Sequence, residues 1–171
     1  LSTINDLSAV EVEERSIAVG DGPGQPETVA NVTASTFALT RVPALMGRTL
    51  LEADERGGAE EVVVVGYDFW KYKLDGAANA VGRVIRISGR PVTIVGVMPR
   101  DFRDPFNTRG ELWRPIALTP QQLSGGRTNE WLNFVGRLAP GTTLERSRVE
   151  MRTLAEQLKR EYRDAYPPDW S

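Results

Sequence analysis

The residues of this chain best suited to chemistry are three carboxylates in one segment, Asp101, Asp104 and Glu111. Paired carboxylates can act as general acid and general base, or can bind a hard cation such as Ca²⁺. Each of the three also has an arginine within three positions, and the arginines concerned are Arg100, Arg103, Arg109 and Arg114. This spacing favours solvated local ion pairs over a catalytic pair. A carboxylate-based hydrolase therefore ranks third among the functions that we consider.

Two residue types are missing, and their absence excludes most familiar enzyme chemistry. The chain has no Cys and no His. Ser-His-Asp and Cys-His catalysis, zinc sites built from Cys or His, and disulfide bonds are therefore all excluded. We predict no catalytic residue, no metal site, no cofactor and no enzymatic activity.

One glycine-rich segment invites comparison with a phosphate-binding loop. Gly20-Asp21-Gly22-Pro23-Gly24 lacks the Lys-Ser/Thr ending of a P-loop, and Pro23 has no backbone N–H to offer a phosphate. We predict a hairpin turn at this point, and no ATP site in the chain.

A set of aromatic residues is the only site that we predict from the residues themselves. If exposed, these side chains could form a platform for a partner protein, a lipid or a hydrophobic substrate. Aromatic residues in loops also fold back as anchors of the interior, so burial of all of them would exclude the platform. The predicted surface consists of Phe102, Phe106, Trp113 and Trp131.

The elements that must position these residues are clearest between Val62 and Met98. The run Val62–Val65 predicts a strand covered on both faces. Residues 67–74 change to a helical period and end at Asp75-Gly76. Residues 83–87 and 92–97 alternate as two strands of a hairpin, with residues 88–91 as the turn.

Weaker patterns flank this region on the amino-terminal side. We expect a strand or two within Leu7–Val19 and a returning strand over residues 28–34. Ser35 or Thr36 is expected to cap a short helix that ends before Pro43.

On the carboxyl-terminal side, a short strand is expected at Leu112–Leu118 and a last strand at Asn133–Leu138. The clearest helix follows, from Thr143 to Asp164. Thr142 and Glu145 have the spacing of a capping box at its start. We predict that this helix lies as a layer over the sheet.

Composition permits one sizeable core or two small lobes. The chain has 171 residues, 40% of them hydrophobic, and a net charge of −2 from 21 basic and 23 acidic residues. That charge gives no attraction to nucleic acid, which we exclude as a partner. No stretch approaches the roughly 20 apolar residues of a membrane helix, and the start does not have the pattern of a signal peptide. We expect a soluble piece excised from a longer protein.

Several motifs, taken in order, resemble the MacB-like periplasmic core domain of ABC-transporter permeases, a family related to FtsX and LolC. The resemblance covers most of residues 28–164, whereas residues 1–25 match weakly. Ser88 stands where the family usually has Asn, and Trp131 lies near a position where many members have His. The motifs are LMGRTL at 45–50 followed by EADE at 52–55, YDFW at 67–70, GRVIRISGRPVTIVGVMP at 82–99 and GRLAPGTTLE at 136–145.

This resemblance implies an α+β fold, a mixed sheet with packed helices, built as two lobes. One lobe is porter-like and consists of residues 1–43 with 131–171. The other is an inserted lobe, residues 44–130, that contains the hairpin. The acidic connector Glu52–Glu61 and the segment Arg114–Glu130 would then act as hinges.

The function that the resemblance implies is non-catalytic. The chain would be the periplasmic domain of a permease in the bacterial inner membrane, transmitting conformational change or engaging substrate while ATP is hydrolysed elsewhere. Its partners would be its own transmembrane helices, a cytoplasmic ATPase domain or chain, and periplasmic proteins, in a dimeric full-length protein. The alternative is a stand-alone extracytoplasmic ligand-binding or adaptor domain.

Overall fold

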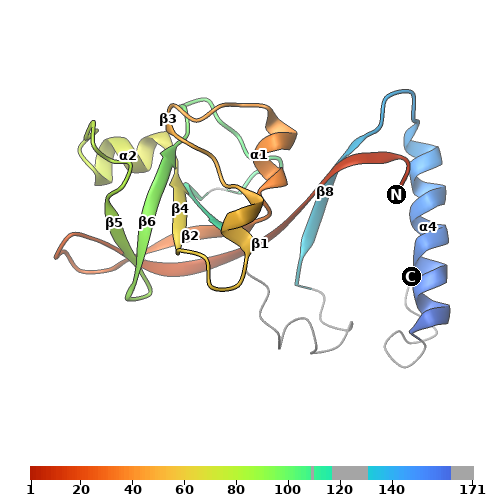
Figure 1. The fold of residues 1–171 in the computed structure, drawn as a ribbon, viewed down its shortest axis with the longest axis horizontal. Coiled ribbons are helices and arrows are strands. Elements are labelled where there is room, and N and C mark those ends of the chain that lie inside the picture. Colours follow the sequence, from red (N-terminus) through yellow and green to blue (C-terminus); the bar gives the residue numbers. More distant parts are fainter. Residues whose placement is uncertain (109, 117–130, 163–171) are drawn as a thin grey trace.

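The computed structural model describes residues 1–108, 110–116 and 131–162 of the chain. The described strands form one mixed sheet in the order β2-β7-β4-β6-β5-β1-β8, with β3 (Met46–Gly47) paired to β6. β1 also pairs with β2, so six of the strands close into a ring. Figure 1 shows this ring with helices α1 (Ser35–Thr40) and α2 (Tyr67–Lys73) beside it. The predicted α+β class with a mixed sheet is confirmed.

Two hydrophobic clusters fill the ring and cover one of its faces. β4 (Val62–Val65) contributes to both, because Val63 and Val65 point to one side and Val62 and Val64 to the other. The first cluster draws on all six strands of the ring and includes Phe69 of α2. The second lies beneath α1. Every residue of β4 is buried, as predicted for a strand covered on both faces.

The predicted hairpin is present as β5 (Val84–Ile87) and β6 (Arg90–Val97). Its turn residues Ser88 and Gly89 have φ values of 50° and 81°. Two consecutive residues with positive φ are typical of the type I′ turn, whose twist matches that of the flanking strands. The turn therefore fixes the register of the hairpin.

β1 is the longest strand of the sheet. It runs from Ile4 to Val19, whereas β2 spans Gln25–Val32 and β7 spans Leu112–Pro115. Residues 10–17 of β1 pair with β2 and residues 17–19 with β5, inside the ring. Residues 4–10 pair instead with β8 (Asn133–Leu138), which precedes helix α4 (Leu144–Glu161). We call β8 and α4 together the arm, and Figure 1 shows it standing apart from the ring.

The predicted helix caps are wrong in detail. α1 has Ala34 as its N-cap, with no side-chain cap from Ser35 or Thr36. The Ser35 hydroxyl donates instead to the Leu7 carbonyl at 2.7 Å, because β1 runs beside the helix. At α4 the cap is Thr143 and not Thr142, and its hydroxyl accepts a hydrogen bond from the Arg146 N–H at 3.2 Å.

The prediction that the last helix forms a layer over the sheet is also wrong. In the described residues, α4 buries only Ser147, and Leu144 and Met151 of its apolar stripe are exposed. The helix is attached at its amino-terminal half, where the Glu150 carboxylate binds the start of the chain. None of the helices in the described ranges has the length and apolar content of a membrane span.

The predicted boundary between lobes does not follow the packing. Ile17 and Val29, from the predicted porter-like lobe (1–43 with 131–171), share a cluster with Val63 and Ile94 of the predicted inserted lobe (44–130). The packing separates the ring from the arm instead.

Two valines of the hairpin allow a matched test of this core. Val92 is 1% exposed and Val84 is 54% exposed. We expect Val92→Ala to lower the free energy of unfolding by roughly 2 kcal/mol, since it removes two buried methyl groups and leaves a cavity. Val84→Ala should cost less than about 1 kcal/mol, the scale of strand propensity alone. Urea denaturation of both variants measures the difference, and equal costs would contradict the described packing.

Candidate functional site

Three chain segments meet at one edge of the sheet. β4 and β6 are parallel, so the residues that follow them lie at the same edge. The Met98 N–H donates to the Val65 carbonyl at 2.8 Å, and the Gly66 N–H donates to the Glu111 carbonyl at 2.7 Å. The start of α2, the segment after Met98 and the start of β7 are thereby joined.

Glu111 caps helix α2 from another part of the chain. The N-cap residue of α2 is Gly66, which has no side chain to cap with. The Glu111 carboxylate accepts a hydrogen bond from the Phe69 N–H in its place. A Cβ at position 66 would lie only 2.8 Å from the Cβ of Glu111, so the close approach requires glycine.

The same carboxylate is partly buried, with consequences for its charge. Burial, with a further contribution from the nearby negative charges of Asp68 and Glu27, raises the pKa of Glu111, although backbone hydrogen bonds act in the opposite direction. Glu111 is therefore a structural acid with a perturbed pKa.

The other predicted carboxylates do not form a catalytic pair with it. The buried Asp104 accepts hydrogen bonds from Phe106 N–H at 3.0 Å, Thr108 N–H at 3.3 Å and the Thr108 hydroxyl at 2.8 Å. Asp101 is exposed. Within the described residues, which do not include Arg109, neither Asp104 nor Glu111 forms one of the predicted ion pairs, and both accept hydrogen bonds from backbone amides. Within the described ranges no group of three acids is placed to hold a metal ion.

The predicted aromatic surface is divided by the fold. Phe102 and Trp113 are buried and contact each other edge to face, with ring centroids 5.2 Å apart. Phe37 of α1 stacks on Phe102 at 5.8 Å. Phe106 packs beside this group and is partly buried, and Trp131 is partly exposed outside it. Phe102 and Trp113 therefore anchor the interior, and a partner surface stays a prediction for Phe106 and Trp131.

A polar cavity of about 500 Å³ lies at this edge, beside the aromatic group. We call it the polar pocket. A smaller cavity of about 240 Å³ adjoins it and shares Asp68, Gly110 and Glu111. The lining residues include Arg100, Arg103, Asp104, Thr108, Glu111 and Trp113.

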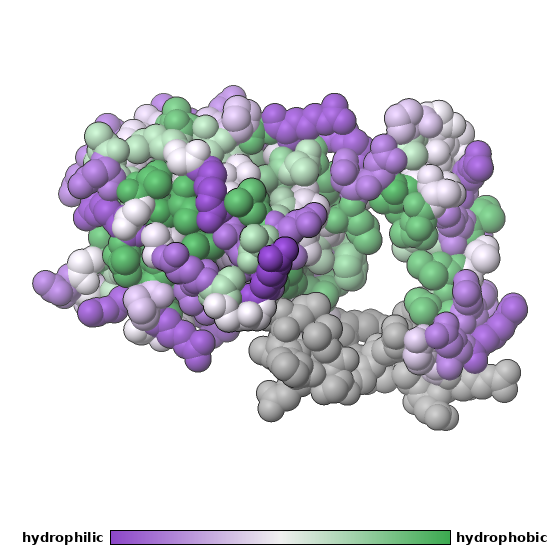
Figure 2. Space-filling view, viewed as in Figure 1, coloured by the Kyte–Doolittle hydropathy of each residue, from purple (hydrophilic) through white to green (hydrophobic). Residues whose placement is uncertain are grey.

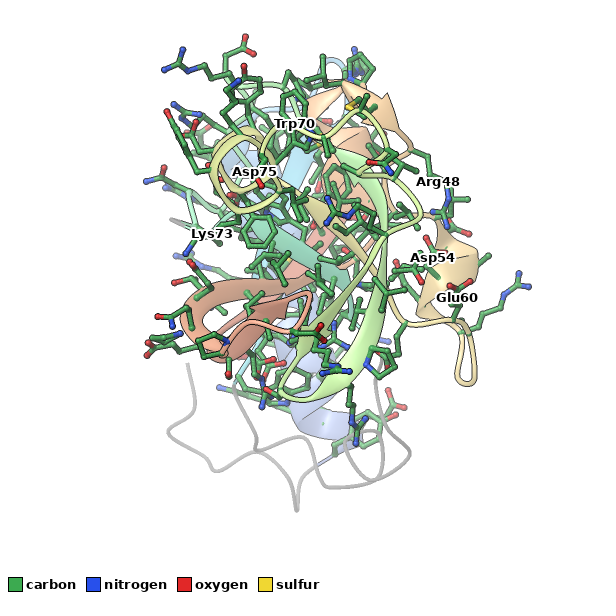
Figure 3. All side chains as sticks on the ribbon, turned by 90° about the vertical axis from the view of Figure 1, so that its left-hand side faces the viewer. Arg48, Asp54, Glu60, Trp70, Lys73 and Asp75 are labelled. Carbon is green, nitrogen blue, oxygen red and sulfur yellow. The ribbon has the colours of Figure 1, made fainter. Side chains whose placement is uncertain are left out.

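The acidic connector Glu52–Glu61 is exposed but firmly attached. Figure 3 labels Asp54 and Glu60 of the connector and Arg48, which precedes it in the chain. Arg48 makes two bonds to Asp54, at 2.7 and 3.0 Å, and the Thr93 hydroxyl donates to Glu60 at 2.6 Å. The Glu55 carboxylate accepts a hydrogen bond from the Ala34 N–H at 2.5 Å. These bonds leave the connector poorly suited to act as a hinge.

The arm forms the second surface of interest. Glu150 of α4 accepts hydrogen bonds from the backbone N–H groups of Ser2, at 2.6 Å, and Thr3, at 2.9 Å, and from both hydroxyls. We call this group the Glu150 clasp. These bonds lower the pKa of Glu150 to about 2, and the hydrogen bond from the Thr3 hydroxyl has the largest effect. The sequence patterns did not indicate the clasp, since its members lie at opposite ends of the chain.

Apolar side chains remain uncovered on the arm and on the neighbouring part of β1. Leu7 is 45% exposed and Phe134 of β8 is 60% exposed. Figure 2 shows hydrophobic residues on both sides of the open space between the ring and α4.

Comparison with known proteins gives a consistent match. A family model described as the MacB-like periplasmic core domain matches residues 2–154. No curated protein sequence matches the chain. Solved structures with the same fold include the periplasmic region of MacB from Actinobacillus actinomycetemcomitans, which is 18% identical with a TM-score of 0.65. The match covers 95% of this chain and 69% of that one.

Two further structures share the fold at similar levels. The extracellular domain of the ABC-type transporter YknZ from Gram-positive bacteria is 14% identical with a TM-score of 0.66, covering 94% of this chain and 77% of that one. A domain described as part of a permease from Porphyromonas gingivalis is 15% identical with a TM-score of 0.67. The match covers 99% of this chain and 74% of that one.

Substitution of Glu111 tests its cap and its perturbed pKa. Glu111→Ala removes the acceptor at the start of α2 and should lower the free energy of unfolding by about 1 kcal/mol. Glu111→Gln keeps an oxygen acceptor but cannot ionise. Since the raised pKa means that the folded state binds the proton more tightly, wild type should lose stability relative to Glu111→Gln as the pH rises from the unfolded pKa through the folded one. Denaturation across that pH range measures both effects.

Glu14, exposed on β1, supplies the control for this experiment. Glu14→Ala should change the free energy of unfolding by no more than about 0.5 kcal/mol. If Glu111→Ala were no more destabilising than Glu14→Ala, the capping role would be excluded.

The Glu150 clasp predicts a change at acid pH. A depressed pKa means that the contribution of the clasp is complete above the unfolded pKa and is lost as the pH falls toward about 2. In a carboxyl ¹³C NMR titration we expect the midpoint of Glu150 to rise in Thr3→Val, which removes one hydrogen bond and keeps the side-chain shape. The same midpoint in both proteins would show that the Thr3 hydroxyl does not stabilise the carboxylate.

Proposed function

The chain belongs to the MacB-like periplasmic core domain family, the outer domains of ABC-transporter permeases, and from this premise we propose that it transmits conformational change outside the membrane. The sequence motifs indicate this family, and the match over residues 2–154 confirms it. Domains of this family are non-catalytic. In the proposed role, ATP is hydrolysed in a separate cytoplasmic domain or chain.

The continuity of β1 is the observation that best supports this role. One strand of 16 residues, roughly 50 Å long at 3.3 Å per residue, pairs with the ring along one part and with the arm along the other. A displacement of the arm therefore acts on the ring through paired backbone and not through a flexible linker.

The Glu150 clasp supports the same proposal. It joins Ser2 and Thr3, just before β1, to the amino-terminal half of α4. In a permease that holds this domain between two membrane helices, movement delivered near the start of β1 would be passed directly to α4. We propose that the motion takes place between the arm and the ring, and not about the hinges predicted at Glu52–Glu61 and Arg114–Glu130. Residues 117–130 of the second predicted hinge lie outside the described ranges.

The wider assembly follows from the same premise as part of the proposal. The domain would lie on the periplasmic side of the inner membrane, in a dimeric permease with a cytoplasmic ATPase and periplasmic partner proteins. The exposed apolar residues of the arm and of β1 are available for such contacts. The polar pocket is the feature that a stand-alone ligand-binding domain would use, and it keeps that alternative in second place.

Distance measurements in the parent permease test the proposed motion. The chain has no Cys, so spin labels can be attached at introduced cysteines without removing any from this domain. Labels at Arg152 on α4 and Tyr72 on α2 are both exposed and report the distance between arm and ring. We expect electron–electron double resonance to give different distance distributions for the nucleotide-free and the ATP-trapped permease.

Labels at Tyr72 and Val84 supply the control, because both positions are exposed on the ring. Their distance should stay the same in both states. An unchanged Arg152–Tyr72 distribution in a permease that hydrolyses ATP would contradict the proposal.

A further inference from the structure

The arm is attached to the ring without hydrophobic packing. Among the described residues, the two hydrophobic clusters contain no member of β8 or α4, and none of β1 before Val10. At Val10 the strand changes partners, because it pairs with β8 up to that residue and with β2 from it onward. The first part of β1 and β8 therefore leave the ring as a ribbon of two strands (Figure 1).

Strand pairing alone leaves the direction of such a ribbon open. The twist between neighbouring strands ranges over roughly 10–35°, and it is larger in two-stranded ribbons. The Arg137 guanidinium of β8 donates to the Leu39 carbonyl of α1, but the Arg137 side chain is exposed, so water competes for this bond. The direction of the arm therefore depends on what else holds β1 at the edge of the ring.

Four hydroxyl groups meet where β1 leaves the ring. Ser8 of β1 and Thr36 of α1 are both fully buried, and their hydroxyls are hydrogen-bonded to each other. The hydroxyl of Thr33, which follows β2, lies 3.2 Å from that of Ser8 and 2.8 Å from that of Ser35. We call these four residues the hydroxyl cluster. Ser8 belongs to the part of β1 that pairs with β8, whereas the other three lie on α1 or just before it.

The hydroxyl cluster also holds the backbone of β1. The Thr33 hydroxyl accepts from the Ala9 N–H at 3.0 Å, and the Thr33 N–H donates to the Ala9 carbonyl at 3.1 Å. The Ser35 hydroxyl donates to the Leu7 carbonyl at 2.7 Å. Each hydroxyl of the cluster thus has a partner. A buried network whose members are all satisfied specifies one geometry, because hydrogen bonds are directional and hydrophobic contacts are not.

We propose that the hydroxyl cluster is a latch that fixes the direction of the arm relative to the ring. Hydrogen bonds weaken steeply as their angles change, so rotation of the arm about Val10 would break the bond between Ser8 and Thr36. The use of this latch in transport rests on the proposed function, since an arm that does not move needs no latch. In that role the permease would open these bonds without taking either hydrophobic cluster apart.

A paired substitution tests the latch in the isolated chain. Ser8→Ala with Thr36→Val removes both partners of the buried bond and nearly keeps the side-chain shapes. The urea midpoint should stay within about 0.5 M of the wild-type value, since replacing both partners by apolar groups is close to neutral for stability. The distance distribution between spin labels at Arg152 and Tyr72 should become broader, because the arm loses a directional restraint.

Two controls separate the latch from other effects. Ser16→Ala with Thr93→Val makes the same two side-chain changes inside the ring, on β1 and β6, and should leave the distribution as in wild type. Labels at Arg152 on α4 and at Asn5 of β1 report movement of α4 against its own end of the ribbon. Their distribution should be the same in wild type and in the double variant.

An unchanged distribution between α4 and α2 in the double variant would overturn the proposal. So would equal broadening in the ring control, or broadening confined to the labels within the arm and its ribbon. If the double variant does not fold, Ser35→Ala, which removes the bond to the Leu7 carbonyl, takes its place with Ser16→Ala as its control. The experiment uses no nucleotide, so failure of the latch is distinguishable from absence of motion in the ATP-driven permease.

Discussion

The pairing of β1 is the constraint on which the rest of the structure depends. Its contacts with β2 and β5 close the ring, and its contact with β8 holds the arm. Alternation along the strand places Val10 in the cluster beneath α1 and Ile17 in the cluster inside the ring. Because side chains alternate with a period of two, a slip of one residue would reverse both positions and expose both clusters at once. Register in β1 is therefore fixed by the core and not by the turn that follows it.

Several acidic side chains of this chain act as acceptors for backbone N–H groups at helix starts and strand ends. Glu111 serves α2, Glu55 accepts from the Ala34 N–H at 2.5 Å at the start of α1, and Glu150 holds the first residues of the chain. In each case the acceptor is distant in sequence from the donor. Helix starts leave such donors without partners inside the helix. Two of the three acids that suggested catalysis, Asp104 and Glu111, are therefore explained by the needs of the backbone.

Sequence patterns predicted those features that depend on neighbouring residues. The buried run of β4, the hairpin of β5 and β6, and the bounds of β8 follow from local periodicity and turn residues, and all three are present. Features that depend on distant residues were not predictable. The apolar stripe of α4 defines a helix face, but the stripe contains no information about whether another element covers it. Likewise, Trp113 reads as a surface candidate until Phe37 of α1 is brought against it.

The polar pocket and the arm are joined by one continuous set of contacts through α1. Trp113 and Phe102, at the pocket, pack on Phe37 of α1. From the same helix the Ser35 hydroxyl bonds to the Leu7 carbonyl of β1, and Arg137 of β8 donates to the Leu39 carbonyl. A ligand in the pocket could influence the arm only if it favoured one of two positions of this helix, since proximity alone transmits no free energy. α1 is short and has no side-chain cap, so its position is fixed by these contacts more than by its own stability. Its buried side chains Thr36, Phe37 and Leu39 hold it between the two, so a coupling between the pocket and the arm would pass through α1.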